Sequence, residues 1–363
     1  MRAAVLREVG GKMPVEELEL RALAPSEVRV RIAACGVCHS DLSVQQGVMP
    51  VMLPSVLGHE GAGTVEEVGS AVSTVAPGDH VIMAPIAPCR VCFFCLRGEP
   101  TLCEQGFNHM FTPYARAGDE DIGPGLGPAA FGEETIVPEA SVVPLDASFP
   151  LHVAALIGCG VVTGVGSVVN SAKVEPGATV AVIGCGGVGL AAIQGARLSG
   201  AAQIIAVDRV AERLEHATGS GATDTVDASH GDAVVTVREL TDGRGVDYSF
   251  EVVGLSATIH QAYNMARRGG TVTIVGAGGF DDMVSFSAAN LMVDARTIRG
   301  CVFGSTDPLR DFPRLVRWQE QGLLDLERLV TKRIGLDDID EAFAEMLDGK
   351  GARSVVMLDS GVT

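Results

Sequence analysis

Apolar and polar residues alternate in the first part of the chain, with the two-residue period of a half-buried β-strand. The alternation is clearest in 27–32, Glu-Val-Arg-Val-Arg-Ile. Two further strands are predicted at 61–68 and 80–83, bounded by Gly-Ser and Pro-Gly-Asp turns. Residues 112–132 are rich in Gly and Pro and show no period, which predicts a long surface loop. The first part of the chain is therefore predicted to be β-rich.

The pattern changes after about residue 161, where short, nearly continuous apolar runs are typical of strands buried on both faces. The strands predicted here are 179–183, 203–207, 246–253 and 271–276. A helix is predicted at 188–198, and other helical stretches separate the later strands. Strands that alternate with helices predict a parallel sheet with helices on both faces. From about 302 the chain returns to mixed helix and strand and ends in an apolar run at 354–358.

Composition narrows the functional classes. The 363 residues are 47% hydrophobic and 20% charged, which is enough apolar material for two domains with buried cores. The formal net charge of −18 and the 4% aromatic content argue against nucleic-acid and membrane partners, although a local basic site for one anionic cofactor is compatible with them. The first twenty residues mix acids and bases and lack the apolar core of a signal peptide, so we expect a cytoplasmic protein.

Four of the nine cysteines lie within fifteen residues, and metal binding is the natural explanation in a reducing compartment. They are Cys89, Cys92, Cys95 and Cys103. Thiolates at this spacing can close around one zinc ion and leave no open position, which makes the site structural. An iron–sulfur cluster is the alternative, but ferredoxins favour proline after the last cysteine, where this chain has Glu104. Four buried cysteines without a metal are the third interpretation.

A second candidate metal set is spread along the chain. It consists of Cys38 in the run 35–41, His59 in Gly-His-Glu at 58–60, and Cys159 in Gly-Cys-Gly at 158–160. Two cysteines and one histidine with an open fourth position form a known catalytic zinc arrangement. Spacing alone does not show that the three residues meet, so scattered buried thiols are an equal alternative.

Residues 184–189, Gly-Cys-Gly-Gly-Val-Gly, lie between a predicted strand and a predicted helix. The glycines there permit a tight turn, a close approach to a pyrophosphate and helix–strand packing, and the helix start offers N–H groups to phosphate. Asp208 follows Gly189 by nineteen residues, at the end of the next strand. A carboxylate there accepts from ribose hydroxyls and repels a 2′-phosphate, which favours NAD over NADP; the adjacent Arg209 weakens that preference. A glycine turn without a ligand is the alternative.

Together these segments resemble the zinc-dependent alcohol dehydrogenases of the medium-chain dehydrogenase/reductase superfamily, over essentially the whole chain. The motifs that carry the resemblance are CGVCHSD at 35–41, LGHEGAG at 57–63, the four-cysteine segment, GCG at 158–160, GCGGVG at 184–189 and Asp208. The resemblance implies an α/β protein with a GroES-like β-rich catalytic domain, a Rossmann domain with a doubly wound parallel sheet, and an active-site cleft between them. The implied bounds are 1–160 with a structural-zinc lobe at about 88–104, 161–301 for the Rossmann domain, and 302–363 for a return to the catalytic domain.

The resemblance also implies a role for each site residue. Cys38, His59 and Cys159 match the catalytic zinc ligands, and the four clustered cysteines match the structural zinc ligands. Asp41 matches the carboxylate that orients the histidine. Glu60 matches a carboxylate that in some members exchanges with water at the zinc. Ser40 matches the hydroxyl that hydrogen-bonds the substrate alcohol.

The cofactor contacts implied by the resemblance come from several segments. The residues concerned are Gly184, Gly186, Gly187, Val188 and Gly189 at the turn, Thr163 and Val188 at the nicotinamide, Asp208 and Arg213 at the adenosine ribose, and His39 and Arg353 at the pyrophosphate. We therefore expect two zinc ions and NAD per chain, oxidation of an alcohol to an aldehyde or ketone in a reversible reaction, and a homodimer or homotetramer. Zinc lowers the pKa of the alcohol, and the cofactor takes the hydride.

Two departures from the family pattern bear on proton transfer and on substrate. Ser43 stands where many members end a proton relay in histidine, so water, His39 or another group must release the proton. Pro85 replaces a pocket aromatic, and Ser40 replaces threonine, which favours a roomier pocket and a bulky or aromatic primary alcohol. The alternatives are a thiol-dependent formaldehyde dehydrogenase acting on a hydroxymethyl-thiol adduct, a polyol or amino-alcohol dehydrogenase, and a non-catalytic NAD- and zinc-binding protein.

Overall fold

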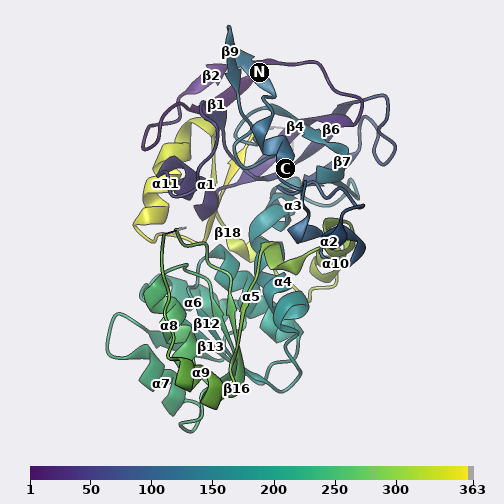
Figure 1. The fold of residues 1–363 in the computed structure, drawn as a ribbon. Helices are drawn as coiled ribbons and strands as arrows, with labels where there is room; N and C mark the ends of the chain where they lie inside the picture. Colours follow the sequence, from purple (N-terminus) through teal and green to yellow (C-terminus); the bar gives the residue numbers. More distant parts are fainter. Residues whose placement is uncertain (280, 359–363) are drawn as a thin grey trace. The chain divides into compact units, whose positions relative to one another are not determined.

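Mostly antiparallel strands build the first of two compact units in the computed structural model, which describes residues 1–279 and 281–358. Of the described residues, this unit comprises 1–160, 307–320 and 326–358. Its largest sheet has the strand order β11-β7-β6-β4-β19-β18, with β10 also paired to β4. Figure 1 labels β4, β6, β7 and β18 of this sheet. The predicted strand at 27–32 is confirmed and extends to Gly36, and its residues Val28, Val30 and Ile32 are buried in the core. The first unit is therefore β-rich, as predicted.

The strands of the first unit are β1 (Arg2–Leu6), β2 (Val15–Glu17), β3 (Glu19–Leu20), β4 (Glu27–Gly36), β5 (Ser55–Val56), β6 (Glu60–Val68), β7 (His80–Met83), β8 (Ala115–Ala117), β9 (Glu120–Ile122), β10 (Glu134–Pro138), β11 (Val142–Leu145), β18 (Val330–Ile334) and β19 (Arg353–Met357). Its α-helices are α1 (His39–Gln45), α2 (Phe93–Leu96), α3 (Leu151–Leu156), α10 (Pro308–Glu320) and α11 (Ile339–Leu347). The pairing of β19 with β4 returns the end of the described chain to the first sheet.

The prediction of a surface loop over 112–132 is wrong. Strands β8 and β9 form an antiparallel hairpin that pairs with β3. Further on, Phe131 is fully buried and packs on Phe343, with 6.3 Å between ring centroids. The backbone N–H groups of Ala130 and Phe131 donate to the carbonyls of Gly58 and Leu57, at 2.7 and 3.0 Å. Backbone hydrogen bonds to distant residues thus order this segment, although its sequence has no periodic pattern. The same hydrogen bonds hold the residues that precede His59.

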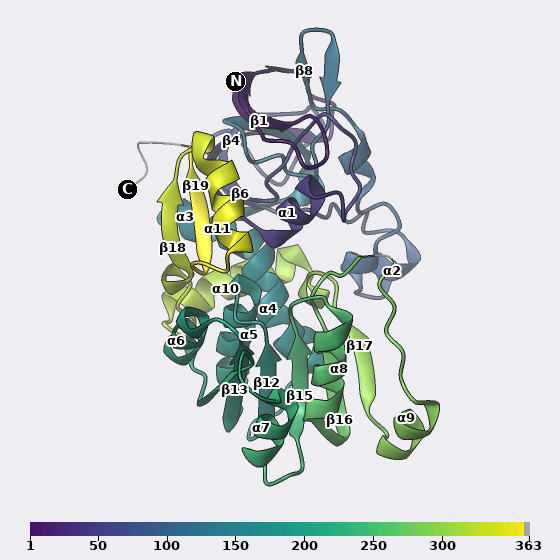
Figure 2. The ribbon, with the colours of Figure 1, turned by 90° about the vertical axis from the view of Figure 1, so that its left-hand side faces the viewer.

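A six-stranded parallel sheet forms the second unit, which comprises 161–306 and 321–325. Its strands are β12 (Thr179–Ile183), β13 (Gln203–Asp208), β14 (Asp224–Asp227), β15 (Val246–Glu251), β16 (Ala266–Ile274) and β17 (Thr297–Gly300). The order β14-β13-β12-β15-β16-β17 is that of a doubly wound Rossmann sheet, with its reversal between β12 and β15. Figure 2 shows β13, β12, β15, β16 and β17 side by side in this sequence.

Helices connect these parallel strands. The connecting helices are α5 (Gly187–Leu198), α6 (Ala211–Ser220), α7 (Ala233–Glu239), α8 (Ser256–Met265) and α9 (Ala288–Asp294), and α4 (Val162–Gly166) precedes the first strand. Helix α5 packs on α6, and α7 packs on α8. Because parallel crossovers are right-handed, the helices on either side of the reversal cover opposite faces of the sheet. The predicted α/β fold class with a doubly wound sheet is therefore confirmed.

Hydrogen bonds explain how two short segments group with the second unit. Residues 302–306 join it because Asn170 Nδ2 donates to Gly304 O at 3.3 Å and the hydroxyls of Ser171 and Ser305 are 2.6 Å apart. Residues 321–325 join it because the Gln194 side chain bonds both backbone groups of Asp325, at 2.7 and 2.9 Å. The compact units therefore divide the chain differently from the sequence-based boundary after residue 301.

One helical segment of the described residues, Leu151–Ala172, has the length and apolar composition of a membrane span. It is 83% buried inside the protein, as a core helix is. The segment is not a uniform α-helix, because π-helical turns at Ile157–Val161 and Ser167–Ala172 interrupt it. The first of these turns contains Cys159.

Candidate metal centres and dinucleotide site

The dispersed cysteines and histidine meet in the first unit. Ligand atoms of Cys38, His59, Glu60 and Cys159 all lie within 4.8 Å of one another. Cys38 immediately precedes α1, and His59 immediately precedes β6. Cys159 lies in the π-helical turn Ile157–Val161, and such turns concentrate at functional sites because they re-aim a side chain. The predicted set thus forms one cluster.

Asp41 fixes the orientation of His59. Its Oδ2 lies 2.9 Å from His59 Nδ1, and its Oδ1 accepts from the backbone N–H of Gly58 at 2.9 Å. Gly58 has φ +86°, a conformation that glycine adopts without strain. Asp41 and His59 are both buried. At this distance the carboxylate favours the tautomer with its proton on Nδ1, which leaves Nε2 as a lone-pair donor, the usual arrangement of a metal-bound histidine.

Glu60 and Arg353 form a buried ion pair beside the cysteines, with Arg353 Nη2 2.7 Å from Glu60 Oε1. The same oxygen accepts from the N–H of Gly160 at 3.1 Å, and Arg353 Nη1 donates to Val37 O at 3.0 Å. A Cβ at Gly36 would collide with the Glu60 carboxylate, and one at Gly160 would collide with the Arg353 guanidinium. The glycines on both sides therefore leave the space that the pair occupies.

Electrostatics at this cluster favour a metal. Burial raises the pKa of Glu60 to about 8, opposed by Arg353 and reinforced by Cys38. Glu60 Oε2 is buried and has no hydrogen-bond partner in the described structure. The hydrogen bond between the two thiols lowers the pKa of Cys38, helped by the charge of Arg353, and raises the pKa of Cys159, so the first thiolate of the pair forms on Cys38. Thiolate is the form that binds metals, and two sulfurs with one imidazole nitrogen suit zinc, so the residues fit this ion.

Polar groups at the start of α1 lie beside the cluster. Ser40 Oγ lies 4.0 Å from Cys38 Sγ. The exposed His39 places Nδ1 3.4 Å from the hydroxyl of Ser43, which is buried. Ser43 therefore contacts the one exposed titratable side chain of this helix turn, although it cannot itself carry a charge.

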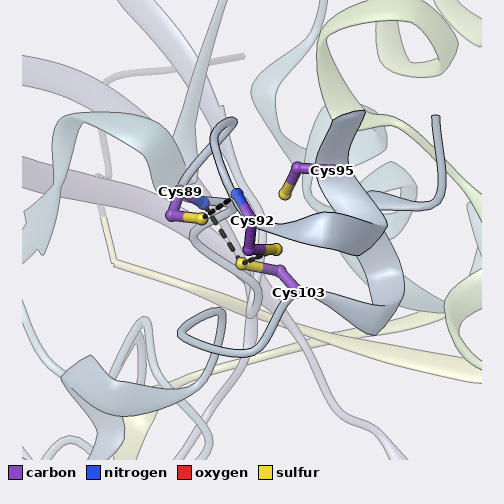
Figure 3. Close-up of side chains that lie close together, drawn as sticks. All are labelled: Cys89, Cys92, Cys95 and Cys103. Carbon is purple, nitrogen blue, oxygen red and sulfur yellow. Dashed lines mark hydrogen bonds between the residues drawn. The ribbon is translucent and has the colours of Figure 1, made fainter. Parts of the chain in front are cut away.

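The four-cysteine segment forms a second cluster, whose sulfur atoms lie within 4.8 Å of one another (Figure 3). The N–H of Cys89 donates to Cys103 Sγ at 3.2 Å, and the N–H of Cys92 donates to Cys89 Sγ at 3.3 Å. Amide donors of this kind stabilise negative charge on sulfur. Four sulfurs at this separation fit a tetrahedral zinc site without an open position. Arg90, between two of the cysteines, anchors the segment through a two-pronged ion pair with Asp307, at 2.8 and 2.9 Å.

The glycine-rich turn lies at the carboxyl end of β12 in the second unit. Gly184 has φ +93°, and a Cβ on Gly189 would collide with the carbonyl of Gly184. A Cβ on Gly186 would meet nothing within 4 Å, so the chain offers open space there. Gly187 and Val188 open α5. The arrangement fits a dinucleotide, because free N–H groups and open space face the phosphate position of a Rossmann sheet.

Asp208 ends the neighbouring strand and is buried. Its oxygens accept from the N–H groups of Cys185 at 2.7 Å and Val210 at 3.0 Å, so it also holds the glycine turn in place. Arg213 lies in α6, and its buried Nε has no partner in the described structure. Thr163 lies in α4, which comes close to α5 because Gly164 has no Cβ to strike the carbonyl of Val188.

Sequence reasoning missed three features. It assigned Arg353 to a pyrophosphate without detecting its ion pair with Glu60, which joins residues 293 positions apart. It also missed the pairing of Arg90 with Asp307. It further missed Glu251, which is buried at the end of β15 and accepts from the N–H groups of Val253 and Gly254, both at 2.8 Å. An acid that ends an apolar strand was the available signal for Glu251.

Comparisons with known proteins indicate alcohol dehydrogenases in both parts of the chain. Residues 24–147 match the family described as alcohol dehydrogenase GroES-like domain, and residues 187–321 match the one described as zinc-binding dehydrogenase. The chain is 38% identical to the NDMA-dependent alcohol dehydrogenase of Amycolatopsis methanolica, over 98% of both chains. It is also 38% identical to the probable S-(hydroxymethyl)glutathione dehydrogenase 1 of Schizosaccharomyces pombe, over 98% of this chain and 96% of that one. Among solved structures, benzyl alcohol dehydrogenase from Acinetobacter calcoaceticus matches with a TM-score of 0.93 and 31% identity, over 99% of both chains.

Proposed function

The chain belongs to the zinc-dependent alcohol dehydrogenases of the medium-chain dehydrogenase/reductase superfamily, and we propose that it oxidises a bulky or aromatic primary alcohol to an aldehyde, reversibly, with hydride transfer to NAD. The observation that carries the proposal is the cluster of Cys38, His59 and Cys159, backed by Asp41. Three ligands of this kind leave one position of a tetrahedral ion open for substrate.

The proposed reaction balances as the loss of two hydrogens from the alcohol. The carbon–hydrogen bond breaks with its electron pair, and the hydroxyl proton leaves separately. Zinc, when bound, supplies Lewis acidity that lowers the pKa of the substrate hydroxyl. We assign the first contact with that hydroxyl to Ser40, which lies 4.0 Å from Cys38 Sγ. The neighbouring His39 is exposed and can pass the proton to solvent.

Two observations support a bulky or aromatic substrate. The chain is similar to a benzyl alcohol dehydrogenase of known structure. Pro85 is buried beside Gly127 and His109, so no aromatic side chain fills that position. We infer from the missing aromatic ring that the pocket can accept a substrate ring, whose burial would contribute about 2 kcal/mol at 25 cal/mol per Å².

The second candidate substrate is a hydroxymethyl adduct of a low-molecular-weight thiol. It is favoured by the 38% identity to the probable S-(hydroxymethyl)glutathione dehydrogenase of Schizosaccharomyces pombe. The two candidates share the metal cluster and the hydride acceptor, and they differ in whether formaldehyde turnover requires an added thiol.

We propose NAD rather than NADP because the buried carboxyl group of Asp208 lies at the strand end where a 2′-phosphate would lie. A solved relative 27% identical to this chain binds NADP, so the preference requires its own test. We also propose two zinc ions per chain and a homodimer or homotetramer in the cytoplasm. None of the nine cysteines forms a disulfide in the described structure, which is the state expected in a reducing compartment.

The test follows NADH formation from benzyl alcohol, ethanol, longer alkanols and polyols, and from formaldehyde with and without glutathione. NADP replaces NAD in a parallel series, and a zinc chelator serves as the control. We expect kcat/KM for benzyl alcohol to exceed that for ethanol by at least about tenfold, because the ring is buried. Equal values for the two alcohols would contradict the aromatic assignment, and thiol-dependent turnover of formaldehyde would favour the second candidate.

A further inference from the structure

Five arginines line one pocket of about 550 Å³ in the second unit, although the whole chain has a net charge of −18. The lining residues are Arg238, Arg244, Arg267, Arg268 and Arg296, with Gly243 and Asp294. We call this set the arginine pocket. Helices α7 and α9, which contribute Arg238 and Asp294, both lie at the lower end of the second unit in Figure 1.

The arginine pocket lies at the amino ends of parallel strands. Arg244 precedes β15, Arg267 and Arg268 are near the start of β16, and Arg296 precedes β17. The glycine-rich turn is at the carboxyl end of β12, in the same parallel sheet. The two sites are therefore at opposite ends of the parallel strands, separated by about 20 Å for strands of this length. A ligand in the arginine pocket would not displace a dinucleotide.

Backbone carbonyls hold several of the guanidinium groups in place. Arg238 donates to Asn264 O at 3.0 Å and to Gly243 O at 3.2 Å. Arg267 donates to Arg268 O at 2.7 Å. Carbonyls fix the direction of a guanidinium without neutralising its charge, so Arg238 is both ordered and available to an anion, whereas Arg267 also pairs with Asp247 at 2.6 Å.

Arg296 is the most firmly held member. Its side chain is 6% exposed, it donates to Ala266 O at 3.1 Å, and it lies over the ring of Tyr263 at 4.5 Å. In contrast, the side chains of Arg244 and Arg268 are 74% and 73% exposed. The arginine pocket thus combines a fixed, buried cation with two accessible cations at its rim.

The carboxylates in contact with the arginine pocket do not balance its charge. Asp294 pairs with Arg268 and Arg296, Asp247 with Arg267, and Asp242 with Arg244. The five guanidinium groups that line the pocket and the three carboxylates that pair with four of them sum to a charge of +2. Gathering like charges in an acidic protein costs electrostatic energy, which an anionic ligand would offset.

We propose that the arginine pocket binds a small, multiply charged oxyanion of the phosphate class. The planar fork of arginine matches phosphate oxygens with paired hydrogen bonds. The pocket volume lies within the usual range for small-molecule sites. A free inorganic polyphosphate and the phosphate chain of a nucleotide share this chemistry, and the experiment distinguishes them. The proposal is independent of the alcohol chemistry.

The test measures calorimetric binding of phosphate, pyrophosphate, tripolyphosphate and ATP to the full chain, with NAD at saturation so that the dinucleotide site is filled. We expect affinity to rise with the number of phosphates. The double variant Arg244→Gln/Arg268→Gln should weaken tripolyphosphate binding by at least about tenfold, because the loss of even one charge-assisted hydrogen bond lowers an affinity by about tenfold. Both side chains are exposed, so folding and basal alcohol turnover should be unchanged.

The matched control is Arg2→Gln/Arg116→Gln, which removes the same charge from exposed positions of the first unit. It should leave tripolyphosphate affinity within about twofold, because long-range charge effects are screened by salt. If ATP binds as tightly as tripolyphosphate, the phosphate chain is the recognised group. If ATP binds more tightly than tripolyphosphate, and the pocket variant loses this binding, the ligand is a nucleotide. Affinities weaker than about 1 mM, an equal loss in the control, or binding unaffected by the pocket variant would overturn the proposal.

Discussion

The two cysteine clusters of the first unit are assembled in different ways. Cys89, Cys92, Cys95 and Cys103 come from fifteen consecutive residues, and backbone N–H groups donate to two of their sulfurs. Cys38, His59 and Cys159 come from three distant segments and are surrounded by buried ionisable side chains, among them Asp41, Glu60 and Arg353. The four thiolates of the first cluster would fill every position of a tetrahedral zinc ion, whereas the second cluster offers three ligands and a neighbouring carboxylate.

This difference indicates that the four-cysteine cluster stabilises the fold and that the mixed cluster carries out the reaction. Buried charges are costly unless they are paired, so a protein retains them where the charge has a use. A closed set of four thiolates needs none, because its metal only cross-links a loop. We therefore expect loss of a ligand to affect turnover at the mixed cluster and to affect unfolding at the four-cysteine cluster.

The largest effect is expected for Cys38→Ala. Removing one of three catalytic ligands should lower kcat/KM by at least about 10³-fold, because Lewis-acid stabilisation of several kcal/mol is lost. Metal analysis should find one zinc per chain in place of two. Cys301→Ser, at a buried cysteine outside both clusters, is the control and should keep both ions. Turnover retained by Cys38→Ala would refute the assignment of the catalytic ligands.

Cys95→Ser should show the opposite behaviour. Opening the four-cysteine cluster releases a loop of about fifteen residues, a cross-link with an estimated contribution of about 3 kcal/mol. At about 2–4 °C per kcal/mol, the melting temperature should fall by about 6–12 °C. The kcat measured well below that temperature should stay within about threefold of the parent value, since no residue of the mixed cluster changes. A loss of kcat as large as that of Cys38→Ala would remove the distinction between the clusters.

Asp41→Asn tests whether the mixed cluster depends on its supporting carboxylate. The asparagine oxygen can still accept from Gly58, which directs its NH₂ group at His59 Nδ1. The imidazole must then carry its proton on Nε2, the nitrogen that the metal needs. We expect zinc affinity or kcat/KM to fall by about 10–100-fold, measured by competition with a chelator. Asp121→Asn, at a surface ion pair, should leave both values unchanged.

The clusters also mark how far the sequence could predict the site. The four-cysteine cluster was predictable from spacing because so short a segment can close on one ion. The meeting of Cys38, His59 and Cys159 depends on long-range pairing, such as Gly36 opposite Glu60 between β4 and β6. No local pattern encodes that register, so only the family resemblance brought those residues together.

The same limit explains the errors in the fold. The alternating segment at 27–32 and the apolar run at 179–183 bury their own side chains, so their patterns identify β4 and β12. The segment 112–132 has its partners elsewhere, as the bond from Phe131 to Leu57 shows. The sequence around Arg353 and around Glu60 likewise gives no sign that the two residues form an ion pair, because each looks like an ordinary charged residue.

The smallest effect is expected for Arg90→Gln, which tests how the four-cysteine segment is anchored. The variant removes the two-pronged ion pair with Asp307, whose side chains are both partly exposed. Asp307 Oδ1 retains the backbone N–H of Leu309 at 3.3 Å, so no buried charge is left without a partner. Unfolding free energy should therefore fall by about 1 kcal/mol or less. Zinc release to a chelator should be faster than in Arg116→Gln, which removes a surface pair away from the cysteines. Equal release rates in the two variants would show that the thiolates alone hold the segment, and a kcat change would show that the two clusters are coupled.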